Sequence, residues 1–152
     1  MCLIDYKKID TSKRKRGIKC YKVLETTYGT FDSPLFGDHD GGHAWTIGEI
    51  REIEAETPWL TDTYRSNPTT DFYAPCITGD GYHTCKTLKS VKEYLKWLNG
   101  HGSIRKFVIA ECMIPKDTKY VYEGTAVVSS DDEGYPGYVS QSLKIVKLLK
   151  KA

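Results

Sequence analysis

The sequence lacks long apolar runs. No stretch of it approaches the roughly 18 consecutive apolar residues that a bilayer-spanning helix needs. The first ten residues, MCLIDYKKID, also lack the apolar core and small-residue cleavage site of a secretory leader. We therefore expect a protein of the cytosol with no membrane partner.

Closely spaced cysteine pairs are absent as well. The five cysteines stand at positions 2, 20, 76, 85 and 112, an odd number with no C-x-x-C pair. Structural zinc sites draw their four ligands from such pairs, and disulfides are rare in proteins of reducing compartments. The pattern predicts reduced thiols, most of them buried, and no metal site built on cysteine.

The glycine patterns of nucleotide-binding enzymes are also missing. Neither G-x-x-x-x-G-K-S/T nor a strand-linked G-x-G-x-x-G occurs, and Gly79-Asp80-Gly81 is typical of a turn. These absences exclude P-loop and Rossmann enzymes, and we expect no bound cofactor.

Two polar groupings contain residue types that can form a metal site or a catalytic site. The cluster Asp38-His39-Asp40-Gly41-Gly42-His43 has ligands for a divalent metal, but Asp, His and Gly are also ordinary loop formers. His83 and Cys85 share one face of an extended segment, yet no oxyanion hole accompanies them. The sequence favours a surface loop for the first grouping and no catalytic role for the second.

The net charge of +2 hides an asymmetry along the chain. Residues 1–24 carry +6, residues 143–152 carry +4, and residues 25–142 carry −8. The basic run at 13–16 has no interleaved aromatic residues, and the acidic body repels a polyanion. We therefore expect no nucleic-acid partner. The run is interpreted as a solvated arm or as one that pairs with the protein's own acidic surface.

Hydrophobic periodicity predicts one principal helix, over about 87–99. Thr87 is its expected N-cap, and Leu88, Val91, Leu95 and Leu98 form its apolar stripe. The strongest strands are expected at 18–24 and 104–114. Further expected elements are a short strand at 44–48, a short acidic helix at 49–56, a hairpin of 119–123 with 125–128, an acidic loop at 131–137 and a strand at 143–146. The tail after this last strand fits a strand or a helix.

These elements predict a single α+β domain. Residues 1–17 are expected to form a basic N-terminal arm, and residues 18–152 the domain, with a loop-rich insertion at about 28–80. The expected architecture is a mainly antiparallel sheet with the principal helix packed on one face.

The chain is rich in aromatic residues, with 11 Tyr and 3 Trp. Tyr21, Tyr82 and Tyr120 lie on or beside predicted strands. Rings with a flat apolar face and a polar tip suit stacking on a planar ligand, and they equally suit core packing. The aromatic content alone leaves both interpretations open.

The order of several short motifs resembles one protein family. These motifs are Cys20-Tyr21-Lys22, Gly81-Tyr82-His83, Ile114-Pro115-Lys116-Asp117-Thr118 and Ser140-Gln141-Ser142-Leu143-Lys144-Ile145. Together they are similar to small uncharacterised proteins of phages, prophages and gut-associated bacteria. The chain departs from that pattern at Asp117, where the family tends to have Gly, and in its longer 28–80 region. The resemblance implies a phage or mobile-element setting in the host cytosol, without a reaction.

A more distant similarity is to ADP-ribosyltransferases. Tyr21-Lys22, His83-Thr84 and Gln141 follow the order of that family's motifs. However, Gln141 offers an amide where the family has an ionised carboxylate, and Lys22 replaces the preferred Arg. The resemblance therefore implies a binder on a related scaffold, and a transferase using NAD is the alternative.

We expect a non-enzymatic phage-type accessory protein, plausibly acting in counter-defence. Its expected partner is a host protein or an anionic, nucleotide-like small molecule. The alternatives are an ADP-ribosyltransferase-like enzyme and a virion or structural accessory protein. No catalytic or metal-ligating residues are assigned. The predicted ligand-binding residues are Tyr21, Lys22, Tyr82, His83, Tyr120 and Gln141.

Overall fold

The computed structural model describes residues 2–12, 14–26, 29–32, 44–54, 60–65, 73–77, 81–100, 105–127 and 134–149. Within these ranges it contains ten strands and one helix. The strands are β1 (Cys2–Lys8), β2 (Ile18–Glu25), β3 (Ile50–Glu52), β4 (Leu60–Arg65), β5 (Tyr73–Ile77), β6 (Tyr82–Cys85), β7 (Phe107–Ile114), β8 (Val121–Val127), β9 (Tyr135–Ser140) and β10 (Ser142–Leu148), and the helix is α1 (Leu88–Gly100).

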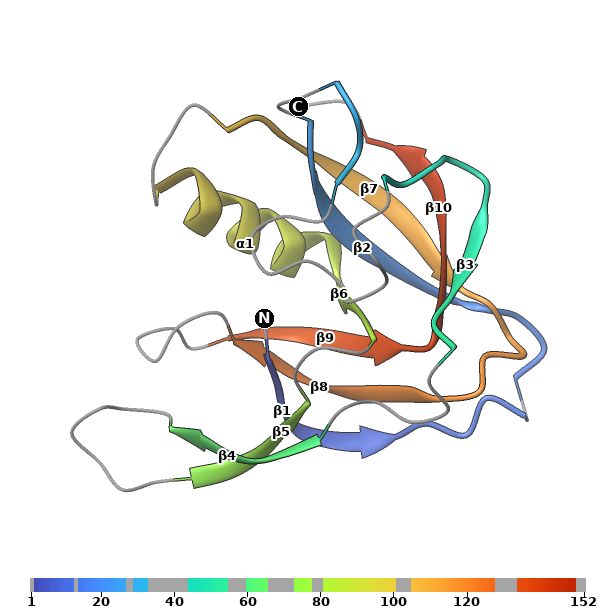
Figure 1. The fold of residues 1–152 in the computed structure, drawn as a ribbon, viewed down its shortest axis with the longest axis vertical. Helices are drawn as coiled ribbons and strands as arrows, with labels where there is room; N and C mark the ends of the chain where they lie inside the picture. The colour runs from blue at the N-terminus through green and yellow to red at the C-terminus, as the bar shows by residue number, and fades with distance from the viewer. Residues whose placement is uncertain are drawn as a thin grey trace.

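All ten strands belong to one sheet, in the order β3-β10-β7-β2-β6-β9-β8-β1-β5-β4, and every described pairing is antiparallel. The sheet bends into two halves (Figure 1). One half holds β2, β7, β10 and β3, and the other holds β9, β8, β1, β5 and β4. Strand β6 joins them, with one residue paired to β2 and four to β9.

The broad prediction of an α+β domain with a mainly antiparallel sheet and one principal helix is confirmed, although strands dominate more than expected. The predicted strands at 18–24 and 104–114 correspond to β2 and β7, which pair over their full lengths. The strand at 143–146 lies within β10, which continues as a strand to Leu148.

Two segments in the first part of the chain, 1–17 and 49–56, have a structure that differs from the prediction. Residues Cys2–Lys8 of the expected basic arm instead form β1, which lies between β8 and β5 and buries Leu3. The expected acidic helix at 49–56 is wrong, because Ile50–Glu52 pairs with β10 as β3. Both strands depend on partners far along the chain, and local periodicity does not report such pairing.

The region expected to be a loop-rich insertion, 28–80, contributes β3, β4 and β5 to the sheet. The short strand expected at 44–48 is not formed, since those residues lie in irregular structure and a turn. Within the acidic loop expected at 131–137, residues 135–137 instead belong to β9, and residues 131–133 lie outside the described part of the chain.

The hairpin expected between 119–123 and 125–128 is replaced by one continuous strand, β8. Gly124, between the two segments of the expected hairpin, lies within this strand. In the structure a Cβ at Gly124 would lie 2.5 Å from the carbonyl oxygen of Ile4, so the glycine permits close approach of β1.

The predicted helix is confirmed, including its N-cap. Thr87 Oγ1 accepts a hydrogen bond from Ser90 N–H at 3.0 Å, and Thr87 N–H donates to Ser90 Oγ at 3.1 Å. This reciprocal pair satisfies backbone donors at the helix start. The buried face is rotated from the predicted stripe: Tyr94 is buried, and Leu88 is 36% exposed. In the described residues no helix is long and apolar enough to cross a membrane.

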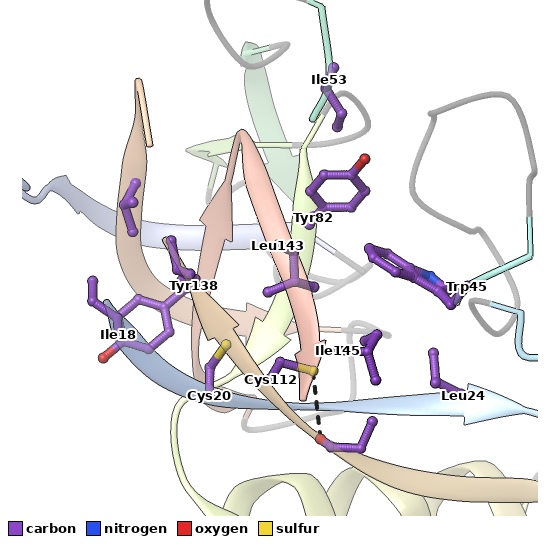
Figure 2. Close-up of a cluster of buried hydrophobic side chains, with 13 residues drawn as sticks. Ile18, Cys20, Leu24, Trp45, Ile53, Tyr82, Cys112, Tyr138, Leu143 and Ile145 are labelled. Atoms are coloured by element: carbon purple, nitrogen blue, oxygen red, sulfur yellow. Dashed lines mark hydrogen bonds between the residues drawn. The ribbon is translucent and has the colours of Figure 1, made fainter. Parts of the chain in front are cut away.

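The largest core cluster lies inside the bend of the sheet (Figure 2). Alternate residues of β2 and β7 point into it, and Cys20 lies directly opposite Cys112. Trp45 packs edge-on against Tyr82, with ring centroids 5.1 Å apart. Burial of this face brings the two halves of the sheet together.

A second cluster fills the space between α1 and the other face of the sheet. Val91, Tyr94 and Leu98 of the helix pack with Cys85 and Tyr135 there. Burial raises the pKa of the Cys85 thiol to about 12, so the thiol is neutral at physiological pH. A third, smaller cluster joins β1, β5, β8 and β9.

Candidate functional site

Two of the predicted ligand-binding residues meet at the junction of β2 and β6. Lys22 Nζ donates a hydrogen bond to the carbonyl oxygen of His83 at 2.9 Å. Lys22 is only 6% exposed and follows Cys20 on the face of β2 that points into the largest core cluster. The ammonium group therefore bonds to the backbone of the neighbouring strand in the protein interior.

Gln141 lies between β9 and β10 and forms hydrogen bonds to Ile53, the residue that follows β3. Its Nε2 donates to the carbonyl oxygen of Ile53 at 2.9 Å, and its Oε1 accepts from Ser142 Oγ at 2.9 Å. Its backbone N–H donates to Tyr120 O at 3.1 Å, and its carbonyl oxygen accepts from Ile53 N–H at 3.0 Å. With a side chain 4% exposed, Gln141 uses its amide within the fold.

The three predicted tyrosines pack within the fold. Tyr82 belongs to the largest core cluster. Tyr120 is buried, and its ring centroid lies 6.1 Å from that of Tyr122. Tyr21 is half-buried on the helix-facing side of β2. The structure therefore places Lys22 beside His83 and Gln141 beside Tyr120 in the interior, and their role in ligand binding stays a prediction.

The polar cluster at residues 38–43 lies outside the described residues. Among the residues that the structure describes, no group of three or more His, Cys, Asp or Glu side chains could hold a metal ion.

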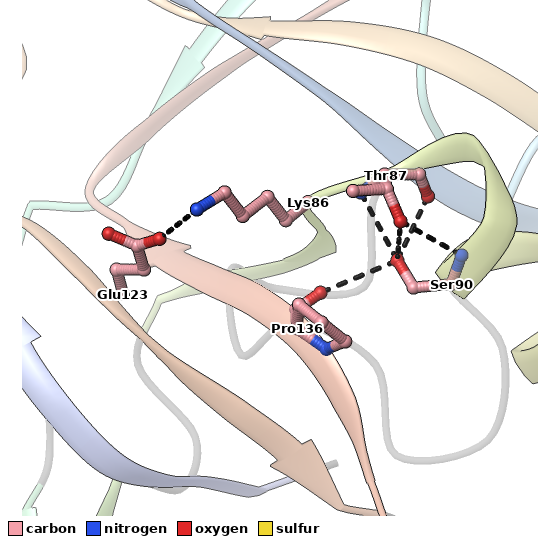
Figure 3. A network of polar contacts seen from close by, with 5 residues as sticks. All are labelled: Lys86, Thr87, Ser90, Glu123 and Pro136. Carbon is pink, nitrogen blue, oxygen red and sulfur yellow. Dashed lines mark hydrogen bonds and ion pairs between the residues drawn. The ribbon is translucent and has the colours of Figure 1, made fainter.

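A second polar group lies where β6, β9, β8 and β1 run side by side, and its basic residues are exposed while its tyrosine is buried in the largest core cluster. We call it the cationic cluster and define it as Lys7, Arg14, Lys86, Glu123 and Tyr138. Lys86 reaches across β9 and forms an ion pair with Glu123 of β8 (Figure 3). Lys7 of β1 lies opposite Glu123 in the ladder, so a second ammonium group projects from the same face.

The backbone around this cluster is fixed. Lys86 N–H donates to Pro136 O at 2.8 Å, directly before the N-cap pair of Thr87 and Ser90. Arg14 lies in a turn closed by its own N–H, which donates to Thr11 O at 3.2 Å. Thr11 Oγ1 in turn donates to the carbonyl oxygen of Thr118 at 3.1 Å, which attaches the turn to the domain.

The electrostatics of the cluster favour donors over acceptors. Burial raises the pKa of Tyr138 above its ordinary value, although Lys86 and Arg14 act in the opposite direction. The hydrogen bond that Lys86 donates to Glu123 raises the pKa of Lys86. At neutral pH Tyr138 therefore keeps its hydroxyl proton and Lys86 keeps its charge, and Lys7 and Arg14 add two exposed basic side chains.

Such an arrangement can bind an anion. Ammonium and guanidinium groups attract phosphate or carboxylate, and a guanidinium group binds these oxygens in a bidentate manner. Arg14 carried a sequence signal, because it belongs to the basic run interpreted as a solvated arm or as one that pairs with the protein's own acidic surface. Lys86, Glu123 and Tyr138 gave no such signal, because only the register of β6, β9 and β8 brings them together.

Comparisons with protein-family models, with curated proteins and with solved structures found no match to this chain.

Proposed function

We propose that this protein is a non-enzymatic binding module for an anionic, nucleotide-like small molecule, and that the cationic cluster holds the anionic group. The resemblance to small phage and prophage proteins supplies the setting for the proposal, which is the host cytosol and plausibly counter-defence. Sequestration of a phosphate-bearing host metabolite fits both the basic cluster and the proposed counter-defence setting.

One observation carries the proposal: Lys86 forms an ion pair with Glu123, and Lys7 lies opposite Glu123 in the ladder of β1 and β8, so two lysines approach one carboxylate. Arg14, Lys86 and Lys7 are exposed, so an anion reaches them without displacing any part of the core. Lys86 and Tyr138 lie on or next to strands, which hold a site more rigidly than loops do.

The transferase alternative finds no comparable support in the described residues. The Gln141 amide, which stands where that family has a carboxylate, is bonded to Ile53 and Ser142. Two carboxylates of the sheet, Glu111 and Glu123, form ion pairs with Lys19 and Lys86.

A thermal-shift screen with ADP-ribose, NAD, a cyclic nucleotide and inorganic pyrophosphate tests the proposal. A ligand present at about 100 times its Kd stabilises a protein by about 2.7 kcal/mol, which raises the Tm by about 5–10 °C for a chain of this size. We expect at least one of these ligands to produce such a shift, and added salt to reduce it because the site is exposed.

Lys86→Gln and Arg14→Gln should each lower the affinity for that ligand about tenfold, which corresponds to about 1.4 kcal/mol. Lys89→Gln is the matched control, since it removes the same charge from an exposed position on α1. Equal losses in all three variants, or no shift with any of the ligands, would contradict the proposal. Release of nicotinamide from NAD would instead establish the transferase alternative.

A further inference from the structure

Strand β3 forms one edge of the sheet and lies outermost beside β10 (Figure 1). Its three residues, Ile50, Arg51 and Glu52, include neither proline nor lysine, two residues that commonly protect an edge from pairing. Ile50 is 52% exposed, the largest value among the large apolar side chains of the described residues. An aliphatic side chain exposed on an edge strand indicates a surface that can accept another strand.

The backbone of β3 shows which groups are directed at such a strand. Ile53 N–H donates to Gln141 O at 3.0 Å, and the register places Arg51 opposite Leu143. Residues of an antiparallel strand bond alternately to one side and the other. Arg51 and Ile53 therefore bond toward β10, and the N–H and C=O groups of Ile50 and Glu52 point away from the sheet.

The side chains at this edge separate into two sets by face. Ile50 and Glu52 share one face, and Lys144 of β10 lies directly opposite Ile50 on it. Glu49, which directly precedes the strand, and Arg51 belong to the other face by the same alternation. That second face therefore carries one acidic and one basic residue two positions apart.

This arrangement of charges selects one way for the edge to pair with its own copy about a twofold axis. With Arg51 on the axis two arginines lie opposite each other, and with Glu49 or Glu52 on the axis two glutamates do. With Ile50 on the axis, Ile50 lies opposite itself and Arg51 lies opposite Glu49 of the other copy, twice by symmetry. Opposite charges across strands stabilise a sheet and like charges destabilise it, so the last of these four registers is favoured.

The backbone and the side chains agree in this register. The outward groups of Ile50 bond to those of its copy, and Arg51 and Glu49 form the adjacent pair without mutual backbone bonds, in which side chains approach more closely. Arg51 is held over the Trp45 ring, with its Cζ 4.3 Å from the ring centroid. A guanidinium group stacked by its face can donate from its edge to a carboxylate. The edge is therefore complementary to a second copy of itself.

We propose that β3 pairs antiparallel with β3 of a second copy of this chain, with Ile50 on the twofold axis and Arg51 paired with Glu49 of the other copy. The pairing joins two sheets edge to edge into one continuous sheet and covers Ile50. The contact is short, so the dimer is reversible and its population rises with protein concentration. This edge lies on a different part of the sheet from the cationic cluster, so either proposal can fail without the other.

Sedimentation velocity with charge-reversed variants tests the register. Glu49→Arg and Arg51→Glu each place like charges opposite one another in both pairs of a homodimer, so each should raise the dimer Kd at least about tenfold. An equimolar mixture of the two variants has opposite charges in both pairs of the heterodimer, and it should associate about as tightly as the unmodified chain. Lys89→Gln, on α1, is the control and should leave association unchanged.

Ile50→Pro tests the backbone pairing separately. It removes an outward N–H that β10 does not use, and proline is tolerated at the first residue of a strand. It should abolish the dimer, whereas Ile50→Val should keep it. Glu49→Arg and Ile50→Pro decide the test if Arg51→Glu fails to fold. A chain that stays monomeric at every concentration, a dimer that survives Ile50→Pro, or a mixture no more associated than its two components would overturn the proposal.

Discussion

Two polar regions lie along β9, one at its end around Gln141 and one near its middle around Tyr138. They differ in whether their polar side chains bond within the protein or face solvent. At the end of β9, Gln141 is buried, and its amide bonds to β3 and β10. Near the middle of β9, the cations Lys86 and Arg14 of the cationic cluster are exposed, although Tyr138 itself is buried in the core. Polar type alone therefore does not separate a side chain that holds the fold together from one that can meet a ligand.

This difference in exposure indicates where a binding site can form in this fold. A buried polar group is stabilising because its bonds within the protein are complete, and a ligand must break them before it can bind. An exposed cation only exchanges water for the ligand. Gln141 and Lys22 therefore stabilise the fold, and we propose that the ligand binds at the cationic cluster.

The largest effect is expected from Gln141→Leu. The substitution leaves the carbonyl oxygen of Ile53 and the hydroxyl of Ser142 without their Gln141 partners, and unsatisfied buried groups cost about 1–3 kcal/mol each. We expect a loss of about 2–4 kcal/mol in the free energy of unfolding, measured by urea denaturation. Lys89→Gln, the surface control, should change it by less than about 0.5 kcal/mol. A Gln141→Leu protein as stable as this control would remove the contrast between the two regions.

A smaller loss is expected from Thr87→Ala, because Thr87 caps α1 directly after Lys86. Loss of an N-cap costs about 1 kcal/mol. The helix start also fixes the backbone from which Lys86 extends, so the affinity for the anionic ligand should fall as well. Thr87→Ser, which keeps the hydroxyl, should restore both quantities. Failure of serine to restore them would show that the cap does not position Lys86.

Lys86→Gln should separate stability from binding. Exposed ion pairs contribute about 0–1 kcal/mol, so the free energy of unfolding should fall by less than about 1 kcal/mol while ligand affinity falls about tenfold. Urea denaturation and calorimetric titration of the same protein samples measure the two quantities. A large loss of stability with unchanged affinity would make the ion pair structural.

The smallest effect is expected from the ionisation of Tyr138. Burial raises its pKa in the folded protein above the ordinary value of 10.0, so its contribution to stability is fully present below about pH 10. That contribution should be lost as the pH rises through the folded-state pKa. Absorbance at 295 nm follows tyrosine ionisation, and Tyr138→Phe should remove one component whose ionisation is delayed to higher pH. A titration identical in both proteins would contradict the expected shift.

The sequence predicted best the elements that depend on contacts between neighbouring residues of the chain, and the strands that it missed depend on residues far apart in the chain. The helix at 87–99 and its cap at Thr87 were predicted because both rest on local contacts. Strands β1, β4 and β5 were missed because each depends on pairing with distant residues. The hairpin expected from 119–123 and 125–128 is one strand instead, because the close approach of Gly124 to β1 has no local signature.

The same distinction applies to the candidate sites. The sequence singled out Lys22, His83 and Gln141 as polar residues near predicted strand ends, but it could not show that they are buried. It showed the basic run that contains Arg14, but not that Lys86 and Tyr138 lie near it. Burial and register are properties of the folded chain, and they decide which polar groups meet solvent.

Chemical-shift mapping by NMR with the ligand found in the thermal-shift screen tests the central claim most directly. We predict that the largest backbone amide shifts cluster at Arg14, Lys86, Glu123 and Tyr138, with little change at Gln141. Shifts concentrated at Gln141 and the neighbouring core, with Lys86 unaffected, would contradict the account and return the binding site to the protein interior.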